Sequence, residues 1–255
     1  MSNTCCLVYT LLMEKKKLTP VTDWIKESLS IYFKKDNFFY LAKFALLQLL
    51  LNGIFYAGSF LFVGKEFYTN PNALASDMPS FFLYFIPSTI LMIIFGTWVY
   101  ATTIHAVSQV VEGKFLGVKE TFKLSAKRVL PFAATAVLVG IVTILGFVLL
   151  IIPGVIFIIW FYFSQYIAVV EKSGPIASMK RSKELVKGYF RPLLGRAVVL
   201  LVYSFAIQSV LAFVLNFFGS ILVTLLYPYF YLLSYLLYNE LKKIKKQKQL
   251  AKPAI

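Results

Sequence analysis

Two long stretches of the chain contain no charged residue, and they restrict the fold more than any other feature. Residues 129–170 are 42 consecutive positions without Asp, Glu, Lys or Arg, and residues 197–239 are 43 such positions. A helix needs about 20 apolar residues to cross the hydrocarbon core of a bilayer. Each stretch is therefore long enough for two crossings, with turn signals at 151–154 (IIPG) and 217–220 (FFGS).

Two shorter uncharged segments precede these stretches. Residues 44–64 and residues 81–111 are each long enough to span a bilayer once. The composition agrees, because only 15% of the 255 residues are charged, against about 25% in soluble globular domains. We predict an all-α polytopic membrane protein with six transmembrane helices in three hairpins.

An amphipathic segment precedes each predicted hairpin, at 19–35, 117–131 and 175–192. Each begins near Gly or Pro, and its apolar and basic residues alternate with a helical period. We expect three interfacial helices, with their apolar faces toward the acyl chains and their lysines toward the headgroups. The chain would then contain three copies of one unit, an amphipathic helix followed by a hairpin.

This pattern divides the chain into three parts. Residues 1–37 are an N-terminal segment that includes the first amphipathic helix. Residues 38–239 are a six-span membrane domain, with amphipathic helices near 117–130 and 175–190. Residues 240–255 are a basic tail.

The positive charges lie almost entirely on one side of the predicted membrane. The chain has 26 Lys and Arg residues and a net charge of +15, and Lys65 is the one basic residue in a loop on the opposite side. Basic loops are retained in the cytoplasm. We therefore predict a prokaryotic cytoplasmic-membrane protein with both termini in the cytoplasm, and nucleic-acid binding is not needed to explain the charge.

The first residues give little further information. Cys5 and Cys6 are adjacent, which fits neither a disulfide framework nor a metal site of recognisable spacing. Residues 1–12 lack the basic segment of a signal peptide. Met13, which precedes a run of lysines, is an alternative start of translation.

A more specific pattern lies in residues 151–196 and near the end of the chain. Its elements are Pro153-Gly154, Glu171, Arg181-Ser182, Glu184-Leu185-Val186 with Gly188, and YLLYNELKK at 235–243. These segments resemble the membrane domain found in front of some bacterial glycerophosphoryl diester phosphodiesterases and its stand-alone polytopic relatives.

The resemblance implies a membrane fold and no catalytic residues. Relatives often carry a basic residue around Trp160, whereas this segment is uncharged, and only 15 residues follow Glu240, where a phosphodiesterase domain would stand. Hydrolase sites need clustered acids, histidines or a nucleophile with its base. The chain has one His, and its 11 acids all lie outside the predicted spans. We predict a protein that is not an enzyme, without a cofactor or a metal site.

The lysines of the second and third amphipathic segments are the candidate lipid-binding residues. A basic residue near an anionic leaflet contributes about 1 kcal/mol to membrane association. The candidate headgroup-binding residues are Lys119, Lys123, Lys127, Lys180, Arg181, Ser182, Lys183 and Lys187. The alternative is that these charges only set the topology.

Polar side chains within the predicted spans suggest a second site. A polar intramembrane path could include His105, Gln165, Tyr227, Tyr231 and Tyr235, although Tyr and neutral His also serve in helix packing. The predicted function is to organise, sense or scaffold at the anionic cytoplasmic leaflet, with anionic phospholipid as the partner. The alternative is a transporter or channel for a small or lipidic solute.

Overall fold

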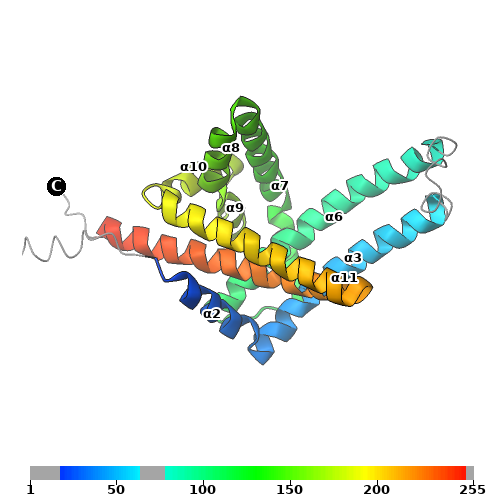
Figure 1. Cartoon of the computed structure of the whole chain (residues 1–255), viewed down its shortest axis with the longest axis horizontal. Helices are drawn as coiled ribbons and strands as arrows, with labels where there is room; N and C mark the ends of the chain where they lie inside the picture. The colour runs from blue at the N-terminus through cyan, green and yellow to red at the C-terminus, as the bar shows by residue number, and fades with distance from the viewer. Residues whose placement is uncertain (1–17, 64–77, 251–255) are drawn as a thin grey trace, which may run out of the picture.

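The computed structural model describes residues 18–63 and 78–250, and its regular structure in these ranges is entirely helical (Figure 1). The helices are α2 (Val21–Tyr32), α3 (Lys35–Val63), α6 (Met78–Glu112), α7 (Val118–Leu149), α8 (Ile151–Phe161), α9 (Ser164–Val170), α10 (Pro175–Val186) and α11 (Phe190–Leu250). The predictions about Cys5, Cys6, Met13 and Lys65 lie outside the described residues.

Six segments within these helices are long and apolar enough to cross a membrane. They are Lys35–Gly58, Phe82–Glu112, Val118–Leu149, Ile151–Val170, Phe190–Leu215 and Ile221–Leu250. The structure confirms the predicted all-α polytopic membrane fold.

Helix α11 contains two of these segments because it doubles back on itself. Along a straight helix, Tyr203 and Tyr229 would be about 39 Å apart at about 1.5 Å per residue. Their hydroxyl oxygens are 3.4 Å apart, and Figure 1 shows the two arms of α11 side by side. The predicted turn at 217–220 lies between the two arms, Phe190–Leu215 and Ile221–Leu250.

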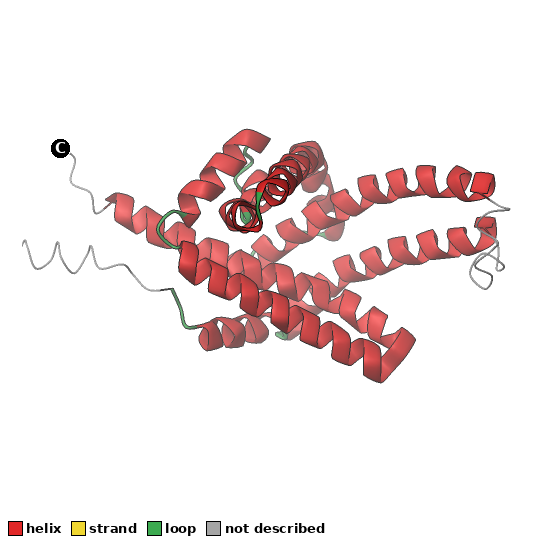
Figure 2. Cartoon of the chain, turned by 45° about the horizontal axis from the view of Figure 1, so that its top comes forward, coloured by secondary structure: helices red, strands yellow, loops and turns green. Residues whose placement is uncertain are grey.

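The three hairpins, α3 with α6, α7 with α8, and the two arms of α11, leave a shared base in different directions (Figures 1 and 2). The buried core lies at this base, where Phe44, Ile104, Phe163 and Leu232 are fully buried. Toward the far ends, apolar side chains such as Val148 and Phe213 are more than 75% exposed. Apolar surface of this extent needs a hydrocarbon environment, which the bilayer supplies.

The α7–α8 hairpin is tight because two glycines meet across it. A Cβ atom on Gly146 would lie 3.0 Å from the Cα of Gly154 and 3.1 Å from its nitrogen. The reversal occurs at Leu150, an extended residue between the two helices. It is therefore one residue earlier than the predicted turn at 151–154, and Gly154 serves as the contact point on the second helix.

The amphipathic segments pack on protein more than the sequence predicts. Helix α2 buries Trp24, Ser28 and Tyr32. The Trp24 indole N–H donates to the carbonyl of Leu233 at 3.1 Å, and the Tyr32 hydroxyl donates to that of Leu225 at 2.5 Å. This face therefore contacts α11, whereas the sequence predicts contact with acyl chains. The second segment is also not a separate helix, because α7 continues through Pro131 into the third span.

The starts of α2, α7 and α10 nevertheless repeat one another in register. Counted from the first residue of each helix, the sixth is Lys, the eighth is Ser, and the fourth and eighth are buried. The lysines are Lys26, Lys123 and Lys180, and the serines are Ser28, Ser125 and Ser182. This shared pattern supports the predicted threefold repeat and places a small polar side chain at each helix contact.

Candidate functional site

The predicted headgroup-binding lysines lie on the surface of two helices that contact each other, α7 and α10. On α7, Lys119, Lys123 and Lys127 follow one another at intervals of four residues and are exposed, so they form one row along the helix. At α10, the exposed basic residues are Lys180, Lys183 and Lys187. The exposed acids on these two segments are Glu120 and Glu184, so this surface, the basic face, carries a net positive charge.

One lysine of the basic face is held by an aromatic ring of the fourth span. The Lys183 ammonium lies 4.1 Å from the centre of the Trp160 ring, within the range of a cation–π interaction. Trp160 is thus the point where α8 supports the basic face.

Ser182 differs from the other predicted headgroup-binding residues because it is fully buried. Its hydroxyl donates to the Trp160 carbonyl at 2.7 Å and accepts from the Phe163 N–H at 3.2 Å. These backbone groups lie at the break between α8 and α9, where helical hydrogen bonding is interrupted. Ser182 therefore satisfies the break in the fourth span and is not part of the basic face.

Arg181 lies in an ionic cluster that joins three elements. The Glu171 carboxylate, just after α9, is 3.8 Å from Arg181 and 2.9 Å from Lys242 of α11. The Tyr238 hydroxyl also donates to this carboxylate at 2.7 Å. Arg181 is half-buried, and its guanidinium is shared between Glu171 and Glu184. It therefore has a structural role in addition to any contact with lipid.

The environment of Glu171 favours the charged carboxylate. Burial raises the pKa of Glu171. The hydrogen bonds from Lys242 and Tyr238 and the charges of Lys242 and Arg181 together lower it by more, so the pKa lies below the usual 4.5. The sequence signal for this cluster was a lone acid directly after a long uncharged run. Its partners on α11 could not be identified without the fold.

Residues of the predicted intramembrane path line two cavities. One, of about 380 Å³, lies between α3, α6 and α11 and is lined in part by Gln48, Asn52 and Tyr227. The other, of about 350 Å³, lies among α6, α7, α8, α9 and α11, and Gln165 lines it. Both have polar side chains in an apolar setting, as ligand cavities commonly do.

Tyr100 and Tyr231 line both cavities. Their rings pack edge to face with centres 4.7 Å apart. Of the predicted path residues, Gln165, Tyr227 and Tyr231 line a cavity, whereas His105 and Tyr235 line neither. Tyr235 is buried against Tyr166 and Tyr238. The sequence did not single out Tyr100, since one Tyr in a span carries no signal of its own.

Among residues 18–63 and 78–250, no group of three or more His, Cys, Asp and Glu side chains is placed to hold a metal ion. No known protein family, curated protein or solved structure matches the chain.

Proposed function

We propose that this integral membrane protein binds and organises anionic phospholipid at the leaflet that its basic face contacts, without catalysing a reaction. The observation that carries the proposal is the pair of exposed lysine rows on α7 and α10, two helices that contact each other. The row on α7 is at the start of the span Val118–Leu149, and α10 lies between the spans Ile151–Val170 and Phe190–Leu215. Each exposed lysine contributes about 1 kcal/mol near an anionic surface. Six of them on adjoining helices favour anionic headgroups over zwitterionic ones.

The positive-inside distribution supports the cytoplasmic leaflet of a prokaryotic cytoplasmic membrane as the location. The resemblance to the membrane domain of glycerophosphoryl diester phosphodiesterases supports a setting among phospholipids. Tail lysines such as Lys243 and Lys246, which are also exposed, would add to the same attraction.

The lipid composition around the protein tests this function. Full-length protein is reconstituted in phosphatidylglycerol–phosphatidylcholine vesicles and extracted with its surrounding lipid into polymer-bounded discs. Wild-type discs should be enriched in phosphatidylglycerol, and replacing Lys119, Lys123 and Lys127, or Lys180, Lys183 and Lys187, by Gln should reduce the enrichment.

A matched control removes three lysines elsewhere. Lys26, Lys34 and Lys35 are exposed, but Asp23, Glu27 and Asp36 accompany them, so that segment is locally neutral. Changing these three lysines to Gln should leave the enrichment nearly unchanged. An equal loss in the control would mean that total charge alone attracts the lipid, and unenriched wild-type discs would refute the proposal.

A second candidate function rests on the two cavities that meet at Tyr100 and Tyr231. Polar cavities within a bundle of apolar helices suit passage of a small or lipidic solute. In a vesicle assay of lipid scrambling, wild-type protein should be active and Gln165→Ala should slow it. Gln208→Ala, which alters an amide that lines neither cavity, is the control. Inactive wild-type protein would leave lipid organisation as the function.

A further inference from the structure

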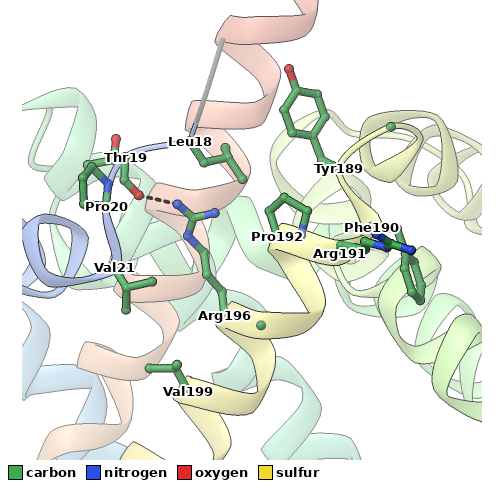
Figure 3. Close-up of a pocket in the computed structure, with 12 residues that line it drawn as sticks. Leu18, Thr19, Pro20, Val21, Tyr189, Phe190, Arg191, Pro192, Arg196 and Val199 are labelled. Atoms are coloured by element: carbon green, nitrogen blue, oxygen red, sulfur yellow. Dashed lines mark hydrogen bonds between the residues drawn. The ribbon is translucent and has the colours of Figure 1, made fainter. Parts of the chain in front are cut away.

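A third cavity lies where the chain before α2 meets the start of α11, and its lining on the α11 side begins at Gly188, one residue after the last lysine of the basic face. It has a volume of about 770 Å³, within the range of ligand-binding cavities. Residues 18–21 form one wall, and residues from the stretch 188–199 form the other (Figure 3). The second wall includes the first turns of the span Phe190–Leu215, so the cavity lies at the membrane boundary.

A buried arginine lies between the two walls. Arg196 is 5% exposed, and in Figure 3 its side chain extends from α11 between Thr19 and Pro192. One terminal nitrogen donates to the Thr19 carbonyl, whereas Nε has no hydrogen-bond partner among the described residues. A buried guanidinium with an unused donor is costly unless an anion or another acceptor completes its bonding.

The protein supplies only part of that compensation. The Arg196 guanidinium carbon is 6.0 Å from the centre of the Trp24 ring. Glu240 is the nearby acid, but its carboxylate accepts hydrogen bonds from Thr19, at 2.6 Å from the backbone N–H and 2.7 Å from the hydroxyl. No described carboxylate forms an ion pair with Arg196. Arg196, which lines the cavity, therefore keeps a buried donor, Nε, without an acceptor in the described part of the chain.

The rest of the lining is mainly apolar. Leu18, Val21, Phe190 and Val199 are part of this lining, and the exposed Arg191 adds a second positive charge. Inorganic phosphate would gain nothing from such walls. A molecule with an anionic head and an apolar body would use both features, and guanidinium groups bind phosphate oxygens well.

We propose that this cavity binds one anionic phospholipid, with its phosphate on Arg196 and its glycerol and upper acyl chains along the apolar walls. This inference rests on the proposed function and deepens it, because it adds one specific site to the diffuse attraction of the lysine rows. Thr19 already bonds to Arg196 and Glu240 of α11, and bound lipid would add to this connection between the chain before α2 and the fifth span.

Native mass spectrometry of the full-length protein in detergent tests the site. We expect wild-type protein to bind a first phosphatidylglycerol at least about tenfold more tightly than phosphatidylcholine. Arg196→Gln should weaken the binding of the first phosphatidylglycerol about 10- to 100-fold. Arg196→Lys should fall between, because it keeps the charge and loses the planar donor group.

A second pair of variants leaves Arg196 in place, in case its replacement unfolds the protein. A Cβ atom on Gly195 would meet nothing within 4 Å, so the side chain of Gly195→Phe has room to enter the cavity. It should weaken the binding of the first lipid as Arg196→Gln does. Gly195→Ala should bind as wild type. Thermal unfolding of each variant establishes that it is folded.

Three results would overturn the site. In the first, wild-type protein binds phosphatidylglycerol no more tightly than phosphatidylcholine. In the second, the Gly195→Phe variant is folded and binds the first lipid with wild-type affinity. In the third, excess inorganic phosphate displaces that lipid. If the lysine variants lose the phosphatidylglycerol enrichment while Arg196→Gln and Gly195→Phe bind lipid as wild type does, that pattern would refute this site and leave the proposed function intact. The reverse pattern would refute the lysine rows as the source of lipid selectivity.

Discussion

Ser182 holds together the broken fourth span. The break between α8 and α9 frees a carbonyl and an N–H at the protein core, and the Ser182 hydroxyl bonds to both. Such groups must be satisfied within the protein at membrane depth. One small side chain on α10 thus fixes the position of this helix against the fourth span.

Replacing Ser182 by Ala should lower the free energy of unfolding by about 1–3 kcal/mol, because two buried backbone groups lose their partner. The measurement is denaturant unfolding in a fixed detergent. Ser30→Ala is the control, since its hydroxyl makes only an exposed local bond to the Glu27 carbonyl. Equal stability of the two variants would show that the break is satisfied in another way.

Glu171 makes stability depend on pH. Its pKa is lowered from 4.5 in the folded protein, so the folded state binds fewer protons than the unfolded state as pH falls past this value. The contribution of Glu171 is fully present above pH 4.5, and it decreases below this pH until the folded carboxylate is protonated. We expect the melting temperature of wild-type protein to fall in this acidic range.

Glu171→Gln should lower the melting temperature at neutral pH and flatten its decline in acid, because Gln cannot form the ion pairs with Arg181 and Lys242. Glu184→Gln is the comparison, since the Glu184 side chain is 68% exposed and exposed ion pairs contribute little. If the melting temperature of Glu171→Gln declines in acid as steeply as that of wild type, groups other than Glu171 cause the pH dependence.

At the scale of the helices, the α7–α8 hairpin depends on close contact between two backbones. Gly146→Ala should destabilise the protein by about 1–3 kcal/mol, the usual range for overpacking, because its Cβ would press on the backbone of Gly154. Gly140→Ala in the same helix meets nothing within 4 Å, and it should be neutral or stabilising by up to about 1 kcal/mol. Thermal unfolding of the two variants distinguishes these cases, and equal effects would contradict the contact.

At the scale of the whole molecule, the exposed apolar hairpins and the charged base define how the protein sits in a bilayer. The turn before α10 lies against the N-terminal half of α7, where Arg128 donates to the carbonyl of Lys172 at 3.1 Å, whereas the α7–α8 turn is at the far end of its hairpin (Figure 1). The loops at the base should therefore share one side of the membrane.

Labelling with a membrane-impermeant maleimide checks this arrangement in full-length protein with Cys5 and Cys6 replaced by Ser. Lys114→Cys and Lys172→Cys should react from the same side as Lys243→Cys, and Leu150→Cys should react only from the other side. In cells, the first three positions should be protected from reagent added outside. Labelling of Lys114→Cys and Lys172→Cys from opposite sides would refute the six-span topology.

The sequence by itself determined the spans and the exposed lysines. Uncharged runs set the number of crossings because a charge in hydrocarbon is expensive. The spacing of lysines on 117–130 and 175–190 placed them on helix surfaces because the helical period is local. These features depend only on residues close together along the chain, so they can be predicted from the sequence.

Only the tertiary structure decided which polar residues meet. Arg196 contacts Thr19, 177 positions away, and Glu171 accepts from Tyr238, 67 positions away. No pattern within either segment specifies its partner, because Ser and Tyr suit a helix contact, a cavity wall or a surface equally well. The sequence therefore predicts Ser182 among the surface lysines and gives no signal for Tyr100 or the Arg196 cavity, since helix packing and not composition brings those residues together.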